Sequence, residues 1–199
     1  MEDKKIEAMF FEIQRRINMI KTIKSIRRNI DILSISEADT QAILVEPILS
    51  FAGFDVSNVF EVKRSKSGKQ DFDLKVYKGG NLLIGIEVKG VKSNEFNICK
   101  EGEEVSKEVG KLTKKKKKFK NKPGDGVGQL RRYALKSKPR VAILTNGVKW
   151  GVFKDVEAFT ENVEESLSPD FFESNFECFD IENMKDFKEL IKFLQELIS

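Results

Sequence analysis

Three ionisable side chains stand close together on the stretch QDFDLKVYKGGNLLIGIEVKG, residues 70–90. Asp71 opens one predicted strand, and Glu87 and Lys89 interrupt the apolar run of the next. Side chains of a strand alternate between the two faces of a sheet, so Glu87 and Lys89 project to one side, and Asp71 on the neighbouring strand can reach the same side. Two carboxylates a few ångström apart repel each other, and burial penalises both charges. A divalent cation would resolve that conflict.

The chemistry that such side chains support is metal-assisted attack on a phosphate. Hard oxygen ligands bind Mg²⁺, which keeps several waters and takes further ligands from a substrate phosphate. Lys89 beside the cation could orient or deprotonate the attacking water, or offset the charge that builds up on the phosphate. The alternative is an acid–lysine ion pair on a solvated sheet face, which is the commoner meaning of Glu-x-Lys by itself.

The composition narrows the choice of chemistry. The chain of 199 residues contains no histidine, which excludes His-dependent nucleases, His-ligated zinc sites and the usual hydrolase triads. General acid–base catalysis would therefore depend on carboxylates, lysine or metal-bound water.

The charge of the chain is unevenly distributed. The net charge is +4, but residues 155–199 hold thirteen acids against three lysines, a balance of −10, so the remainder carries +14. A polyanion such as nucleic acid is therefore a plausible partner of the body of the protein. The alternative is that lysine-rich surfaces serve solubility alone.

The chain has the features expected of a cytoplasmic protein without a membrane segment. No apolar run approaches the roughly 20 residues that a membrane span needs. The N-terminus lacks the apolar core and cleavage site of a signal peptide. Cys99 and Cys178 lie far apart without metal-type spacing, so we expect reduced thiols.

Helical and strand periodicities predict an α/β domain. A helix is expected over residues 2–30 and a second over 36–53, capped by Ser36, ended by Gly53, and kinked or stopped early by Pro47. Three strands are expected at about 55–63, 70–77 and 82–89, followed by a helix over about 126–137. Asn146-Gly147 predicts a hairpin between two β runs, and an amphipathic helix ends the chain.

Four segments in fixed order carry a resemblance to a known family. They are DFDL (71–74), IGIEVK (84–89), GQLRRYA (128–134) and ILTNGVKWGVF (143–153). Together they resemble the N-terminal nuclease domain of type I restriction enzyme R subunits, a member of the PD-(D/E)xK, restriction-endonuclease-like nucleases. The segment 36–55 resembles the opening helix of that domain, so the resemblance covers about residues 36–154, with a further echo near the C-terminus.

This resemblance implies a fold, a cofactor and a set of site residues. The fold would be a restriction-endonuclease-like core, with α-β-β-β-α-β order and a mixed central sheet flanked by helices. A helical extension (1–35) would precede the core (36–156, with a basic insertion at about 92–125), and an acidic segment with a C-terminal helix (157–199) would pack on it. The cofactor would be Mg²⁺, with Mn²⁺ able to substitute. The implied site residues are Asp71, Glu87, Lys89, Gln129 and Tyr133.

Three details of the site remain open at this stage. Asp73 shares a predicted strand face with Asp71 and could be the true metal ligand. Glu37 ends a core-facing helical stripe while Glu46 lies nearly opposite, so Glu37 is the preferred helix acid and a further metal ligand; the alternative for Glu37 is a favourable charge at a helix N-terminus. A run of five lysines is expected to act as a flexible clamp on DNA phosphates, the alternative being a solvated insertion that binds nothing. These residues are Lys114, Lys115, Lys116, Lys117 and Lys118.

The sequence thus predicts a stand-alone, metal-dependent nuclease that cleaves DNA. It has no Walker-type G-x-x-x-x-G-K-[ST] motif, so ATP-driven translocation is not expected of this chain. The alternative is a catalytically idle DNA-binding module or a subunit of a larger restriction or defence complex, and the acidic C-terminal segment could bind a protein partner or the basic body itself. The nuclease hypothesis requires that the acids converge and that the protein's own lysines and arginines do not neutralise them.

Overall fold

The structure is a computed structural model of the chain, and it describes residues 2–27, 36–54, 60–64, 71–90, 126–161 and 174–198. The predicted basic insertion at about 92–125, with the lysines of 114–118, lies outside the described residues. Cys99 lies outside them as well.

A mixed six-stranded sheet forms the centre of the molecule, with the strands in chain order from one edge to the other. Neighbouring strands are antiparallel except for β3 and β4, which are parallel. A parallel pair needs a crossover connection, and helix α5 (Gly126–Ser137) lies in it. The strands are β1 (Phe60–Arg64), β2 (Leu74–Lys78), β3 (Asn81–Val88), β4 (Val141–Thr145), β5 (Lys149–Phe153) and β6 (Phe176–Asp180).

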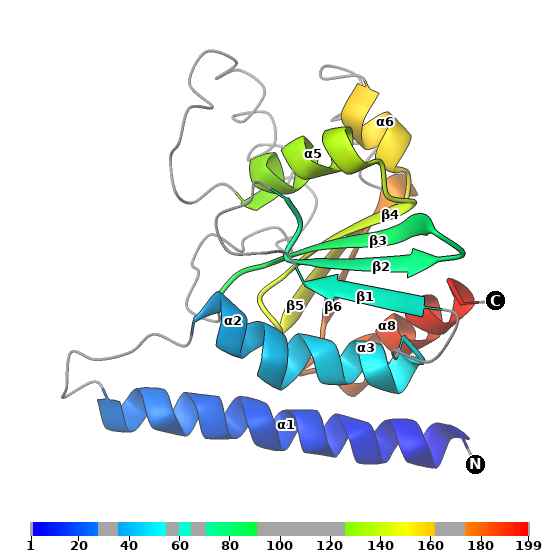
Figure 1. Cartoon of the computed structure of the whole chain (residues 1–199). Helices are drawn as coiled ribbons and strands as arrows, with labels where there is room; N and C mark the ends of the chain where they lie inside the picture. Colours follow the sequence, from blue (N-terminus) through cyan, green and yellow to red (C-terminus); the bar gives the residue numbers. More distant parts are fainter. Residues whose placement is uncertain are drawn as a thin grey trace.

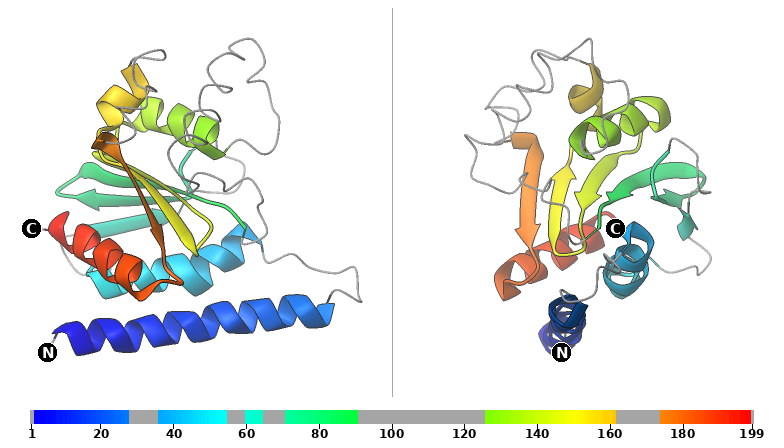
Figure 2. Two further views of the ribbon diagram at one scale, coloured as in Figure 1. Left: turned by 180° about the vertical axis from the view of Figure 1, so that it is seen from behind. Right: turned by 90° about the vertical axis from the view of Figure 1, so that its left-hand side faces the viewer.

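Helices cover both faces of this sheet (Figure 1). The α5 helix and α6 (Val156–Glu161) lie over one face, while α3 (Glu46–Ala52) and α8 (Met184–Glu196) lie over the other. Figure 2 shows the long helix α1 (Glu2–Arg27) outside the layer formed by α3 and α8. The fold is therefore mixed α/β, as the sequence predicts.

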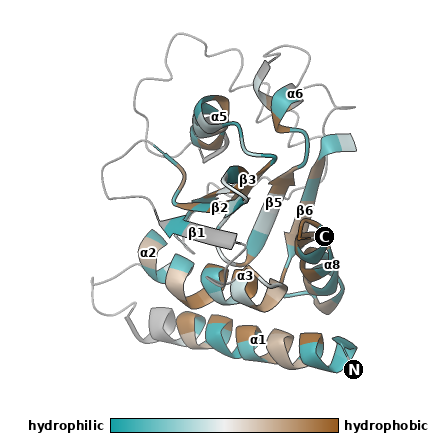
Figure 3. Ribbon diagram, turned by 45° about the vertical axis from the view of Figure 1, so that its right-hand side comes forward, coloured by the Kyte–Doolittle hydropathy of each residue, from teal (hydrophilic) through white to brown (hydrophobic). Residues whose placement is uncertain are grey.

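Two hydrophobic clusters hold these layers together. The larger one joins one face of the sheet to α1, α3 and α8, and the smaller one joins the other face to α5 and α6. In Figure 3 the hydrophobic colour is prominent in the strands, whereas α1 alternates between hydrophobic and hydrophilic segments. Because both faces of the sheet are covered, polar side chains on the central strands are buried unless they lie at the strand ends.

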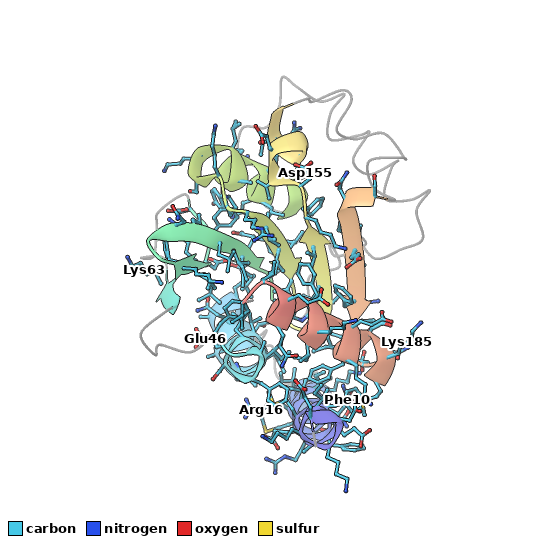
Figure 4. All side chains as sticks on the ribbon, turned by 90° about the vertical axis from the view of Figure 1, so that its right-hand side faces the viewer. Phe10, Arg16, Glu46, Lys63, Asp155 and Lys185 are labelled. Carbon is cyan, nitrogen blue, oxygen red and sulfur yellow. The ribbon has the colours of Figure 1, made fainter. Side chains whose placement is uncertain are left out.

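One stripe of α1 packs into the larger cluster. Its buried members recur at helical spacing: Phe10, Ile13, Ile17 and Ile20. The ring of Phe10 meets that of Phe187 on α8 edge to face, with centroids 5.6 Å apart; Figure 4 labels Phe10 where α1 faces α8. This contact ties α1 to the C-terminal helix.

The helix expected over 36–53 is broken into three parts. After α2 (Glu37–Thr40) comes a π-helical turn, η1 (Gln41–Val45), and then α3. Pro47 has no N–H to donate to the carbonyl of Ile43 one turn earlier, and Arg16 of α1 donates to that carbonyl instead, at 3.0 Å. Gly53, with a φ of +104°, ends α3 in the left-handed conformation as expected.

Some of the remaining predictions about helices, strands and cysteines are confirmed, and others are not. The helix over 126–137 is confirmed, and so are the two strands on either side of Asn146-Gly147. Strand β6 was not expected from the sequence. Cys178 in β6 is disulfide-bonded, so the expectation of a reduced thiol is wrong for this residue. Within the described residues, no helix is long and apolar enough to cross a membrane.

Candidate active site

Side chains from four segments meet at one end of the sheet. Glu87 and Lys89 lie at the C-terminal end of β3, Asp73 directly precedes β2, Glu37 begins α2, and Gln129 lies in the first turn of α5. In Figure 1 the starts of α2 and α5 lie on the same side of the molecule as the end of β3. We call Asp73, Glu87, Lys89, Gln129 and Glu37 the acid–lysine cluster.

The ammonium of Lys89 is the centre of this cluster. Its Nζ lies 2.7 Å from Glu87 Oε1, 2.9 Å from Gln129 Oε1 and 3.5 Å from Glu37 Oε1. Its side chain is only 11% exposed. Burial acts to lower the pKa of Lys89, but the carboxylates of Glu87, Glu37 and Asp73 outweigh it and raise the pKa. Lys89 is therefore held in its charged form.

Glu87 is the most deeply buried acid of the cluster, at 1% exposure. Its backbone pairs with Leu144 in the parallel β3–β4 ladder, so it lies in the middle of the sheet rather than at an edge. Its Oε1 accepts from Lys89, whereas its Oε2 is buried and has no hydrogen-bond partner among the residues that the structure describes. Burial, and then the neighbouring charge of Asp73, raises the pKa of Glu87 to about 8.

Asp73 is the second acid at this position. Its Oδ2 accepts a hydrogen bond from the backbone N–H of Val88, at 2.7 Å, which anchors it against the end of β3. Burial raises the pKa of Asp73, and the charge of Glu37 acts in the same direction. The charge of Asp73 in turn acts on Glu87, which places the two carboxyl groups near each other.

The structure does not bring Asp71 into the cluster. Its carboxylate forms an ion pair with Lys75 and accepts from the N–H of Phe72 at 2.9 Å and from Ser137 Oγ at 3.4 Å. Burial acts to raise the pKa of Asp71, but the hydrogen bonds from Lys75 and Phe72 outweigh it, so the pKa is lowered. Asp71 is thus satisfied by neighbours within its own segment and by the far end of α5.

The physical reason for this difference is where β2 begins. The strand starts at Leu74, which pairs with Ile86, so residues 71–73 are irregular and need not alternate between faces as strand residues do. The sequence pattern places both aspartates on one face. The register of β2 against β3 decides which of the two aspartates lies at the cluster, and the order of residues in the chain does not reveal that register.

Gln129 and Tyr133 come together on α5, one helical turn apart. Gln129 accepts from Lys89 through Oε1 and donates through Nε2 to the hydroxyl of Tyr133, at 3.0 Å. Tyr133 is buried, and its ring meets Phe72 edge to face at 5.8 Å. Gln129 is therefore oriented by Tyr133 and in turn holds Lys89.

Glu37 borders the cluster from the helical side. The Ser36–Asp39 capping box fixes the start of α2, and Glu37, with a side chain 55% exposed, faces Lys89 from there. Glu46, in contrast, accepts a hydrogen bond from Gln41 Nε2. The preference for Glu37 over Glu46 thus agrees with their positions. Thr40, one turn after Glu37, is fully buried, and within the described part of the chain its Oγ1 has no hydrogen-bond partner.

Three carboxyl groups and one ammonium make up the charge of the cluster. Lys89 cannot neutralise Asp73, Glu87 and Glu37 together, and the pKa of Glu87, which is raised to about 8, means that Glu87 retains a proton near neutral pH. The requirement that lysines do not cancel the acids fails for Asp71, which Lys75 neutralises, and is met only in part by the cluster, where one lysine is shared.

The cluster offers two carboxylates to a cation rather than a complete cage. In the part of the chain that the structure describes, no group of three or more Asp, Glu, His or Cys side chains is arranged to hold a metal ion. Mg²⁺, however, is commonly bound through one or two carboxylates, with waters and substrate phosphates completing its shell. Asp73 and Glu87 fit that requirement, because Glu87 Oε2 is buried and unpaired.

Comparisons with protein-family models, with curated proteins and with solved structures found no match. The geometry of the acid–lysine cluster and the pattern of residues in the sequence are therefore the evidence for a function.

Proposed function

We propose that this chain is a metal-dependent nuclease that hydrolyses phosphodiester bonds in DNA. The observation that carries the proposal is the buried, unpaired Oε2 of Glu87, next to Asp73, while the other carboxylate oxygen of Glu87 accepts from the Lys89 ammonium. A buried carboxylate oxygen without a partner is unfavourable by about 1–3 kcal/mol or more. A cation at this oxygen would remove that penalty.

Each residue of the acid–lysine cluster has a role in the proposal. Asp73 and Glu87 would hold Mg²⁺, or Mn²⁺ in its place, and the cation would supply a metal-bound water of lowered pKa and polarise the phosphate. Lys89, charged and anchored, donates to a phosphate oxygen as negative charge develops. Gln129 and Tyr133 set the direction of the Lys89 ammonium, and Glu37 adds a carboxylate at the solvent-facing side.

The arrangement of elements supports the same proposal. A helix, three antiparallel strands, a crossover helix and a parallel fourth strand follow one another, which is the α-β-β-β-α-β order expected for a restriction-endonuclease-like core. We include in the proposal a relationship to the type I restriction R-subunit nuclease domain, action without a helicase motor, and a cytoplasmic location.

The test is cleavage of plasmid and single-stranded DNA with Mg²⁺, Mn²⁺ or EDTA. Asp73→Asn, Glu87→Gln and Lys89→Met should each lower the rate on the order of 100-fold or more, since each removes a ligand or a charge used in the reaction. Asp71→Asn is the matched control, because Asp71 pairs with Lys75 outside the cluster; it should retain most of the activity.

Two outcomes would contradict the assignment. Equal residual cleavage by wild type and all three cluster variants would attribute the activity to a contaminant. Loss of cleavage in Asp71→Asn with full activity in Asp73→Asn would return the metal-binding role to Asp71.

A second candidate function has one specific observation in its favour. Lys89 already provides an internal cation for Glu87 and Glu37, at 2.7 and 3.5 Å, so the cluster is partly balanced without a metal. A catalytically idle DNA-binding module, or a subunit of a larger restriction or defence complex, could keep such a site for stability. Salt-dependent DNA binding without cleavage under Mg²⁺ or Mn²⁺ would favour it over the nuclease.

A further inference from the structure

In the segment from the start of α5 to Lys154, directly after β5, all charged side chains are positive. Residues 126–154 contain seven lysines and arginines and no acid. Two of them, Arg132 and Lys136, are exposed on α5 four residues apart, and residues at this spacing lie on the same face of a helix. This face begins one turn after Gln129, so a row of cations leads away from the acid–lysine cluster.

A groove lies at the other end of this row. It has a volume of about 630 Å³ and lies between the end of α5, the connector to β4 and the start of α6. Lys138 and Arg140 line one wall from the connector, and both are exposed with no ion pair to any described residue. Lys154 and Asp155, which directly precede α6, and Glu157 on α6 line the opposite wall; Figure 4 labels Asp155 there. We call the connector side, Lys138 and Arg140, the basic wall.

Lys138 occupies a backbone position that normally favours glycine. Its φ is +46°, and its N–H donates to the carbonyl of Ala134 at 2.8 Å, which closes the C-terminal end of α5. A residue with a Cβ is disfavoured in this left-handed conformation, and glycine is the usual choice at such a helix end. The chain thus has a charged side chain at the groove where stability alone would favour glycine.

We propose that the basic wall binds the phosphodiester backbone of a nucleic acid whose scissile phosphate lies at the acid–lysine cluster. Lys138 follows Gln129 by nine residues, about 13 Å along a helix at 1.5 Å per residue. One DNA strand advances about 3.4 Å per nucleotide, so the basic wall would contact phosphates about four nucleotides from the cleavage point. This inference rests on the proposed function and adds where the substrate strand runs.

The acidic side chains of the opposite wall determine which wall of the groove the nucleic-acid strand follows. Glu157 is exposed and forms no ion pair with a described residue, so its carboxylate repels a phosphate backbone across the groove. The strand therefore follows the connector rather than α6. Removing this negative charge should strengthen binding, whereas removing the charges of the basic wall should weaken it.

The experiment measures binding of the full-length chain to a fluorescein-labelled DNA duplex by anisotropy, in EDTA so that no cleavage occurs. The double variant Lys138→Gln/Arg140→Gln should raise the Kd about 10-fold near 0.1 M salt and make the slope of log K against log salt less negative by about 2, since two phosphate contacts are lost. Glu157→Gln should lower the Kd. The matched control, Lys185→Gln/Lys192→Gln on α8, has the same charge change at exposed lysines and should leave the Kd within about twofold.

The variant Lys138→Gly distinguishes a loss of DNA binding from a loss of stability. It should raise the melting temperature, because it relieves the left-handed backbone, and yet weaken DNA binding. Unchanged affinity and salt slope in the double variant, or an equal loss in the α8 control, would overturn the basic wall while leaving the nuclease proposal in place. Absence of DNA binding by the wild type would overturn both.

Discussion

The raised pKa of Glu87 should make the protein less stable as the pH rises through the weakly acidic range. Burial and the charge of Asp73 raise the pKa of Glu87 from its ordinary 4.5 to about 8. Between these two values the folded state holds a proton that the unfolded chain has already lost. The stabilising contribution is therefore fully present below about pH 4.5 and is lost as the pH rises through about 8.

The magnitude follows from the size of the shift. A difference of one bound proton changes the free energy of unfolding by about 1.4 kcal/mol per pH unit, so raising the pH from about 5.5 to about 7 should lower it by about 2 kcal/mol. The chain has no histidine, and no other side-chain type ordinarily titrates in this window. The raised pKa of Asp73 acts in the same direction.

The assay is urea unfolding in EDTA at constant ionic strength, at several pH values across this window. Glu87→Gln should depend on pH much less than the wild type there, because its amide does not titrate and only the raised pKa of Asp73 remains. Glu177→Gln is the control: Glu177 is 44% exposed and pairs with Lys154 on the surface, so this variant should keep the wild-type slope. Mg²⁺ or Mn²⁺ should stabilise the wild type more at about pH 7.5 than at about pH 5.5, since a cation competes with the proton.

Two results would refute this reasoning. A wild-type stability that does not change between about pH 5.5 and about pH 7 would mean that Glu87 is ionised in the folded state throughout. The same downward slope in Glu87→Gln would place the titrating group elsewhere.

Two further predictions concern contacts made by the π-helical turn η1. Gly147→Ala should destabilise the protein by about 2–3 kcal/mol in urea unfolding, because φ is +82° and a Cβ would lie 2.7 Å from Leu44. Gly80→Ala, with a similar φ of +81° but open space around it, should lose about 1–2 kcal/mol; an equal loss in both would mean that the contact with Leu44 relaxes freely. Arg16→Met should lower the free energy of unfolding by about 1–2 kcal/mol, because the carbonyl of Ile43 loses its charged donor, and a change below about 0.5 kcal/mol would show that water replaces it.

Local signals predicted part of the fold well. The helix over 126–137 and the turn at Asn146-Gly147 lie where expected, because helical periodicity and the Asn-Gly turn depend on neighbouring residues alone. Strand β6, in contrast, is a short segment that forms through pairing with β5, and nothing within its five residues distinguishes it from a loop. The sequence predicts a kink or an early stop at Pro47, but α3 continues through Pro47 to Ala52, and the irregular turn is the π-helical one that precedes it, Gln41–Val45.

The candidate site, like the fold, is predicted in part by local sequence signals and in part decided by tertiary structure. The sequence predicts five site residues that the structure brings together: Glu87, Lys89, Gln129, Tyr133 and Glu37. The predicted lysine clamp at 114–118 lies outside the described residues and remains untested.

The sequence by itself determined that Glu87 and Lys89 project from the same face of a strand, since strand alternation is a property of the backbone. It also determined the absence of histidine and hence the dependence on carboxylates and lysine. The tertiary structure alone decided that Asp73, and not Asp71, accompanies them, because the start of β2 depends on its pairing with β3. It also decided the raised pKa of Glu87, because that shift comes from burial and from Asp73, which only folding brings together.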